Sequence, residues 1–242
     1  MKVTVVGTSC TWFKRNNTSF IIDDDIVFDT PDGAYKDIIN YIDIFKIRCI
    51  IITHFHTDHF TDLHIFTTQI MRHGKDRKEK LRVYGPKGIL DKLIELNKLH
   101  VNADDECSKE EVLKAVDFIE LYDGMEFDEG KYHIKSFKME HGKPETFGFT
   151  FCERDSGVVV GFSSDTAPCE NLNKIIVSSN YAFVDFASMK KHDKHMFIEP
   201  FEKLLKDYSK TKIYPVHTSD ENQKYAIEHG FNYLNDGDIL NF

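Results

Sequence analysis

Thr53-His-Phe-His-Thr-Asp-His59 is the stretch of sequence that decides the fold. Its side chains that can bind a metal are His54, His56, Asp58 and His59. The stretch follows Cys49-Ile-Ile-Ile52, an apolar run typical of a strand that is buried on both faces. Imidazole and carboxylate are ligands that zinc prefers, and burying several of them without a metal would be costly. We therefore predict a metal site at the end of a buried strand.

Two metal ions need more ligands than this stretch supplies, and three further candidates stand at or just beyond the ends of predicted strands. They are His141, Asp165 and His217. The strands that precede them are predicted at 132–138, 158–162 and 212–216. Because a sheet holds the ends of its strands rigidly, side chains at these positions can converge on one site.

The other predicted elements give a mixed α/β chain. Further strands are expected at 3–6, 19–22, 26–28, 81–84, 118–121, 147–151 and 182–186. Helices are expected at 34–41, from 61, from 86 to 96 and around Phe201, Leu204 and Leu205, and Asp155-Ser-Gly157 predicts a hairpin turn. The strands come in two runs with helices attached to each, which favours two mixed β-sheets packed face to face in one domain, residues 1–242.

The composition of the chain limits which partners and which cellular compartment we expect. The net charge of -9 argues mildly against a long nucleic-acid partner, since such partners are held by basic surfaces. The single notable basic run, 75–80, contains acidic residues and is interpreted as a solvated helix end or loop. The five cysteines are scattered and form no CxxC pair, which indicates a reducing compartment. We find no signal peptide and no apolar segment of membrane-spanning length, and we expect a cytoplasmic protein.

The 53–59 motif resembles the signature of the metallo-β-lactamase superfamily. Residues 163–172 resemble the segment of transfer-RNA 3′-processing endonucleases that carries a bridging aspartate, and His141 with Thr146-Phe-Gly-Phe149 is similar to their third-histidine segment. The strand segments 5–8, 17–20 and 28–30 also resemble that family, so the likeness runs from residue 3 to about 237. It implies a four-layer αββα sandwich, with the two sheets flanked by helices.

The resemblance also implies a set of ligands for two zinc ions, with manganese as an alternative metal. One ion would be held by His54, His56 and His141. The other would be held by Asp58, His59 and His217, with Asp165 bridging the two. A pair of metals about 3.5–4 Å apart suits phosphodiester hydrolysis, because it activates water and stabilises charge on the phosphoryl oxygens. Asp58 is therefore expected to be essential for catalysis.

A further histidine of the family donates the proton that the leaving oxygen needs. His192 and His195 both stand in the matching stretch, between Asp165 and His217. His195 fits better because His195-Met-Phe-Ile-Glu-Pro200 leads directly into a predicted helix, as in the family. Asp185 stands where the family has an acidic residue that orients this histidine. His192 stays open as the alternative donor.

The expected substrate is small. The chain lacks the basic arm with which transfer-RNA processing enzymes grip their substrate, and it is closer to compact cyclic-nucleotide phosphodiesterases of phage anti-defence systems. We expect it to open 3′,5′-cyclic mononucleotides, such as cCMP, cUMP, cAMP or cGMP, to 5′-monophosphates. Ser9, Thr30 or Thr166 could contact the phosphate, and Phe147 or Phe149 could stack on the base. The family resemblance also implies a homodimer.

Two alternatives remain open at this stage. The nearer one is a transfer-RNA 3′ endonuclease with an unusual recognition surface. The other is a catalytically silent module whose metal serves structure or partner binding. No cysteine stands at a predicted ligand position, which argues against a β-lactamase, and the later motifs argue against a glyoxalase.

Overall fold

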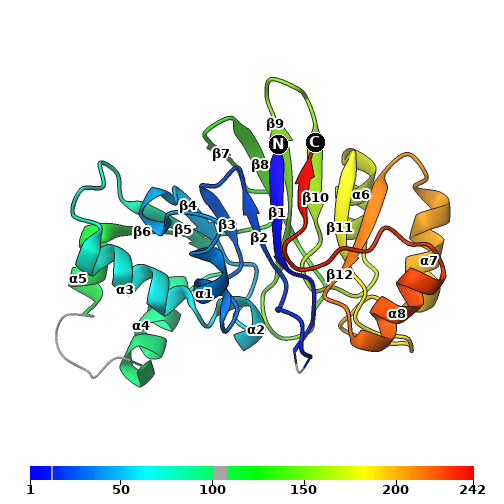
Figure 1. The fold of residues 1–242 in the computed structure, drawn as a ribbon, viewed down its shortest axis with the longest axis horizontal. Helices are drawn as coiled ribbons and strands as arrows, with labels where there is room; N and C mark the ends of the chain where they lie inside the picture. Colours follow the sequence, from blue (N-terminus) through cyan, green and yellow to red (C-terminus); the bar gives the residue numbers. More distant parts are fainter. Residues whose placement is uncertain (12, 101–107) are drawn as a thin grey trace.

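Two mixed sheets form the centre of the protein in a computed structural model that describes residues 1–11, 13–100 and 108–242 (Figure 1). The first sheet has seven strands in the order β13 (Ile239–Asn241), β1 (Lys2–Gly7), β2 (Ser19–Ile22), β3 (Ile26–Phe28), β4 (Cys49–Ile51), β5 (Leu81–Gly85) and β6 (Val116–Glu120). Pairing is antiparallel from β13 to β3 and parallel from β3 to β6.

The second sheet has six strands, also of mixed direction. Their order is β12 (Lys212–Val216), β11 (Tyr181–Asp185), β10 (Val159–Phe162), β9 (Phe147–Glu153), β8 (Tyr132–Lys138) and β7 (Glu126–Glu129). The strands β10, β11 and β12 run parallel, and the remaining pairs are antiparallel. The predicted hairpin turn at 155–157 joins β9 to β10.

Aromatic rings fill the space between the two sheets. Phe28 of the first sheet stacks on Phe162 of the second at a centroid distance of 4.8 Å, and Phe162 stacks on Phe183 at 4.9 Å. These rings are at most 2% exposed. Each buried phenylalanine contributes about 1.5–3 kcal/mol relative to an exposed one, so this layer is a main source of stability.

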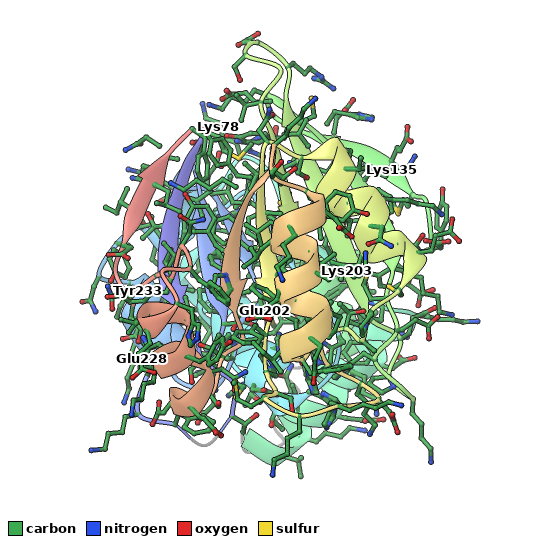
Figure 2. All side chains as sticks on the ribbon, turned by 90° about the vertical axis from the view of Figure 1, so that its right-hand side faces the viewer. Lys78, Lys135, Glu202, Lys203, Glu228 and Tyr233 are labelled. Carbon is green, nitrogen blue, oxygen red and sulfur yellow. The ribbon has the colours of Figure 1, made fainter. Side chains whose placement is uncertain are left out.

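Helices cover the outer face of each sheet, which confirms the predicted four-layer arrangement (Figure 1). The first sheet is covered by α1 (Ala34–Ile38), η1 (Ile44–Lys46), α3 (Leu63–His73), α4 (Ile89–His100) and α5 (Lys109–Ala115). The second is covered by α6 (Glu170–Ser178), α7 (Ile198–Asp207) and α8 (Asp220–Glu228). As predicted, α3 buries Leu63, Phe66 and Ile70. Figure 2 shows the second helix layer from outside, with Glu202 and Lys203 labelled on α7. None of the helices in the described ranges is both long and apolar enough to cross a membrane.

Some elements differ from the sequence-based prediction. The helix expected from residue 86 begins only at Ile89 and continues to His100, because Gly88 adopts a left-handed backbone with φ +85°. The helix expected at 34–41 ends at Ile38. The edge strands β7 and β13 and the helices α6 and α8 were not predicted. The α8 helix is polar on most of its surface, and the Ser219 side chain caps it by accepting from the Asn222 amide.

The direction of the strands decides where functional side chains gather. Parallel pairing brings the carboxyl ends of β3 and β4 to one edge, and those of β10, β11 and β12 to one edge of the second sheet. The 53–59 motif follows β4 and includes the one-turn helix α2 (Thr57–Phe60). The segments that carry Asp165 and His217 follow β10 and β12.

Candidate metal centre

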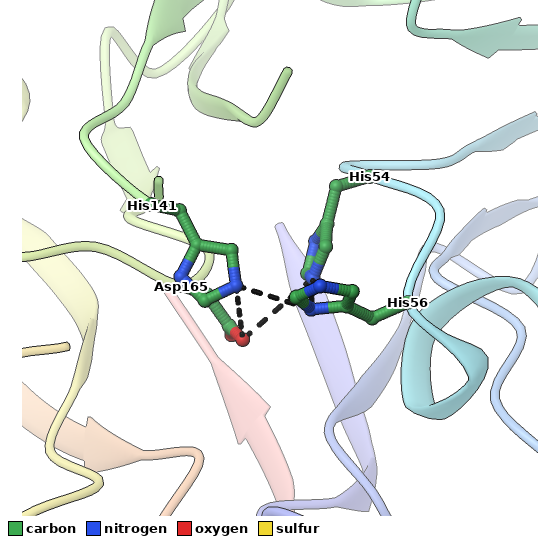
Figure 3. Close-up of side chains that lie close together, drawn as sticks. All are labelled: His54, His56, His141 and Asp165. Atoms are coloured by element: carbon green, nitrogen blue, oxygen red, sulfur yellow. Dashed lines mark hydrogen bonds and ion pairs between the residues drawn. The ribbon is translucent and has the colours of Figure 1, made fainter. Parts of the chain in front are cut away.

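Three overlapping groups of side chains bring ligand atoms within 4.8 Å of one another. The first group is His54, His56, His141 and Asp165 (Figure 3). The second is Asp58, His59 and His217, and the third is Asp165, Asp185, His195 and His217. All seven ligands expected from the sequence fall in the first two groups.

The first group converges through ring nitrogens. His56 Nδ1 lies 3.0 Å from His54 Nε2 and 3.1 Å from His141 Nε2. Asp165 Oδ2 lies 3.7 Å from His54 Nε2 and 3.6 Å from His141 Nε2. Nitrogens bound tetrahedrally to zinc at about 2.0–2.1 Å would be separated by roughly 3.3 Å, so the donor set fits one metal ion.

Asp165 of the first group also lies close to the second group. Asp165 Oδ1 lies 3.3 Å from His59 Nε2, and Asp165 Oδ2 lies 3.4 Å from His217 Nε2. Asp58 Oδ2 also lies 3.4 Å from His217 Nε2. His59 Nε2 and Asp165 Oδ1 are buried and have no hydrogen-bond partner among the described residues. Because unsatisfied buried polar atoms are costly, these atoms fit a site that is completed by a cation.

Neighbouring groups fix the orientation of the histidines. Thr53 donates its amide and its hydroxyl to the two oxygens of Asp29, at 2.8 and 2.9 Å. Asp29 Oδ2 in turn lies 2.7 Å from His59 Nδ1. The carbonyl of Lys194 lies 2.9 Å from His141 Nδ1. Engaging Nδ1 in this way leaves Nε2 of His59 and His141 to face the metal site.

Asp29 is a site residue that the sequence analysis missed. It is 1% exposed and follows β3, so the same criterion that found Asp165, a polar residue just beyond a strand, would have identified it.

The backbone is strained at three points of the site. Asp29, Ser164 and His217 have φ values of 57°, 54° and 54°, and they are among five non-glycine residues with positive φ in the described part of the chain. Such a conformation costs about 1–3 kcal/mol at each residue. Strain of this kind persists where surrounding structure imposes it, and here it lies at the candidate ligands and their immediate neighbours.

Burial and neighbouring charges shift the pKa values of the histidines in opposite directions. Burial, together with the charge of His59, holds the pKa of His54 well below its ordinary value. Burial also opposes a charge on His59, but the carboxylates of Asp165 and Asp29 raise its pKa well above the ordinary value. Burial would raise the pKa of Asp165, but the charges of His217 and His59 lower it well below its ordinary value. The carboxylate is therefore kept ionised, as a metal ligand must be.

His195 and Asp185 form a pair beside the ligands. His195 Nδ1 lies 2.9 Å from Asp185 Oδ2, and the His195 ring stacks on the ring of His217 at 5.3 Å. The amide of Thr166 also donates to Asp185, at 2.9 Å. Burial would lower the pKa of His195, but the Asp185 carboxylate raises it above its ordinary value. His192, the alternative donor, is exposed on the same loop.

A cleft of about 350 Å³ opens beside the centre. Its walls include Asp58, Asp165, His195 and His217, together with Thr11 and Phe13. The Thr11 hydroxyl donates to Asp58 Oδ2 at 2.6 Å. Burial would raise the pKa of Asp58, but its hydrogen bond with His217 lowers it below the ordinary value.

The residues that the sequence analysis expects to contact the substrate are buried and lie outside the cleft, so this prediction is wrong. Phe147 and Phe149 have no exposed surface because they belong to the core between the sheets. Neither can stack on a base in this structure. Ser9 and Thr30 are also fully buried, and the Ser9 hydroxyl donates to the carbonyl of Thr218. Thr166 is buried as well, with its hydroxyl donated to the carbonyl of Ala167. None of these residues lines the cleft.

Comparisons with known proteins agree with this geometry. The family model described as "Beta-lactamase superfamily domain" matches residues 37–218. A ribonuclease Z of Borrelia hermsii is 37% identical over 113 residues, which are 46% of this chain and 33% of the relative. Matches to other ribonucleases Z likewise span about a third to a half of the relatives' length.

Two solved structures share the fold over almost the whole chain. The metallo-β-lactamase-fold protein YhfI from Bacillus subtilis has a TM-score of 0.77 at 15% identity, covering 99% of this chain and 98% of its own. The short form of human tRNase Z has a TM-score of 0.74 at 18% identity, covering 100% of this chain and 99% of its own. At such low identity, the likeness concerns the fold alone.

Proposed function

This chain belongs to the β-lactamase superfamily, and from that premise we propose that it is a two-zinc phosphodiesterase that opens 3′,5′-cyclic mononucleotides to 5′-monophosphates. The observation that carries the proposal is the cleft beside the ligand groups. Its volume of about 350 Å³ lies near the lower end of the ~300–1,000 Å³ of small-molecule sites. It has room for one nucleotide rather than for a folded RNA.

The residues of the two ligand groups define where the ions would sit. His54, His56 and His141 would hold one zinc, and Asp58, His59 and His217 would hold the other, with Asp165 shared. Ions bound there would supply Lewis acidity toward the phosphoryl oxygens and would activate water. Manganese can take the same imidazole and carboxylate ligands.

His195 is the proposed proton donor. Its Nδ1 is engaged by Asp185, so Nε2 is the atom that can hold a proton for the leaving oxygen. When water attacks phosphorus and the bond from phosphorus to the 3′-oxygen breaks, that oxygen takes the proton from Nε2. A positioned acid of this kind contributes about 10²–10⁴-fold to the rate. Asp185 acts through His195, as a positioning residue.

Phe13 replaces the buried phenylalanines as the proposed contact for the base. It lines the cleft and is 38% exposed. An exposed aromatic ring at the mouth of a nucleotide-sized cleft offers a stacking surface that any base can use.

Transfer-RNA 3′ processing is a second candidate function, favoured by the ribonuclease Z relatives. In that case the cleft would receive only the scissile phosphodiester and its neighbouring nucleotide, and the rest of the RNA would be held on the outer surface. The same ligands and the same proton donor would serve this reaction.

One experiment separates these functions. The purified protein is loaded with zinc or manganese and incubated with each 3′,5′-cyclic mononucleotide and, in parallel, with a precursor transfer RNA. Products are separated by chromatography. We expect a 5′-monophosphate from at least one cyclic nucleotide, no product with Asp58→Ala, and a rate lowered about 10²–10⁴-fold with His195→Ala.

His192→Ala is the comparison variant, because His192 lies on the same loop and also lines the cleft but is exposed. A larger loss with His192→Ala than with His195→Ala would transfer the donor role to His192. Cleavage of the RNA with every cyclic nucleotide left intact would replace the small-substrate proposal by the second candidate. Zinc bound without cleavage of either substrate would identify a silent metal-binding module.

A further inference from the structure

A second, larger cavity of about 780 Å³ lies away from the metal centre. We call it the basic groove, and it is lined by residues of α3, of the segment 74–80 and of α5. Its cationic lining residues are Arg72, Lys75, Arg77, Lys78, Lys80 and Lys114. Its acidic lining residues are Glu79 and Glu111. The groove is therefore cationic in a chain whose net charge is -9.

The turn after α3 and the position of α5 bring these cationic residues to the lining of one groove. The helix α3 ends at Gly74, where a Cβ atom would come within 2.5 Å of the Ile70 carbonyl oxygen. This turn sends the chain back, so that Arg77 donates to the carbonyls of Phe45 and Ile47 at 2.6 and 2.8 Å. Carbonyl oxygens carry no net charge, so these two contacts do not neutralise the guanidinium of Arg77. The helix α5 packs beside α3 and closes the other side of the groove (Figure 1).

Only part of the positive charge is neutralised within the protein. Lys80 pairs with Asp117 at 3.1 Å, and Lys114 pairs with Glu111. Lys75 and Lys78 are exposed, and neither has a hydrogen bond or ion pair within the described parts of the chain. Lys78 is labelled in Figure 2.

Polar atoms inside the groove are also unsatisfied. The hydroxyl of Thr68, a residue only 7% exposed, lines the groove and has no hydrogen-bond partner among the residues described. The Nε atom of Arg77 is buried without a partner as well. A buried hydroxyl in an α-helix normally bonds to a carbonyl of the preceding turn. Thr67, the neighbouring residue, does so with Leu63. Both atoms are inaccessible to solvent, so contact with a ligand falls to the exposed lysines.

We propose that the basic groove binds the phosphodiester backbone of an RNA. Phosphate oxygens are the acceptors that lysine, arginine and hydroxyl groups contact along nucleic acids, and an open groove with unpaired lysines suits a chain of phosphates. The groove lies where β5 begins, whereas the metal ligands follow the end of β4, which runs parallel to β5. The RNA is thus held at the opposite edge of the sheet from the cleft.

The test measures binding alone, so it is independent of the proposed catalysis. Metal is removed with a chelator, and the affinity of a fluorescently labelled transfer RNA is measured by anisotropy over a series of salt concentrations. The double variant Lys75→Glu/Lys78→Glu should bind about tenfold or more weakly. Because each lost phosphate contact removes about 0.7–0.9 from the slope of log affinity against log salt, that slope should also fall by about 1.5.

The control is Lys206→Glu/Lys210→Glu, which changes the net charge equally at exposed lysines outside the groove. It should lose less affinity than the groove variant. Equal losses in the two double variants would overturn the proposal, because attraction by overall charge would then account for binding. Absence of RNA binding by the unaltered protein would overturn it as well. Inorganic tripolyphosphate that competes with RNA only in the unaltered protein and the control would support it.

Discussion

The metal centre and the basic groove lie at opposite ends of the parallel strands of the first sheet, and they present charge in opposite ways. At the metal centre, Asp29, Asp165 and His59 are at most 2% exposed and are held by neighbouring groups. In the basic groove, Lys75 and Lys78 are exposed and have no partner among the described residues. The metal centre is therefore preorganised to bind a compact metal ion. The exposed lysines of the basic groove instead act at longer range on an extended polyanion such as RNA.

The largest effect is expected where the two ligand groups meet. Asp165→Asn keeps the size of the side chain but removes the charge that both groups share. We expect loss of bound zinc and a fall in phosphodiesterase activity of about three orders of magnitude or more. Zinc content after gel filtration checks the first effect and initial rates check the second. Asp193→Asn, at an exposed acid, is the control, and a fully metallated Asp165→Asn protein would contradict a shared ligand.

A smaller loss should follow when only the orientation of a ligand is disturbed. Asp29→Asn weakens the contact that fixes His59, and outer ligand-orienting groups typically change metal affinity by about 10–100-fold. Competition with a coloured chelator measures this affinity. Asp32→Asn, three residues away and exposed, should bind zinc as the unaltered protein does. Equal affinities for the two variants would show that Asp29 does not position His59.

The smallest expected effect is a change in the free energy of unfolding when buried hydroxyls beside the basic groove are removed. Thr68→Val removes a buried hydroxyl without a partner, so the free energy of unfolding should rise by about 1 kcal/mol. Thr67→Val removes a hydroxyl that donates to Leu63, so the free energy should fall by about 1 kcal/mol. Urea unfolding of the metal-free proteins measures both. A loss of stability in Thr68→Val would mean that its hydroxyl already has a partner in the folded protein.

The sequence predicted the metal centre better than the basic groove because the two depend on different information. The four side chains of the 53–59 motif are close in sequence, and their partners stand just after strands, so pattern alone brings them together. The groove needs Lys114 of α5 beside the 74–80 segment, and no local pattern predicts that contact. From the sequence alone, the basic run is therefore interpreted as a solvated helix end or loop.

Tertiary packing also explains the errors in the fold and in substrate contacts. A strand rich in phenylalanine can line a site or a core, and only the packing of the second sheet against the first assigns Phe147 and Phe149 to the core. The strand β7, with the sequence Glu-Phe-Asp-Glu, forms through its pairing with β8 despite its poor strand propensity. The short edge strand β13 depends in the same way on β1.

The left-handed backbone at Asp29 and His217 restricts how this protein can be made more thermostable. Exchanging a strained residue for glycine is an ordinary route to stability, but at these two positions it would delete the side chains that build the centre. Asp23 and Asp24 share the left-handed conformation in the turn between β2 and β3. Asp24 pairs with Lys2, whose side chain is 35% exposed, and such surface pairs contribute about 0–1 kcal/mol. Selection or engineering for heat resistance therefore has freedom at Asp24 and very little at the ligands.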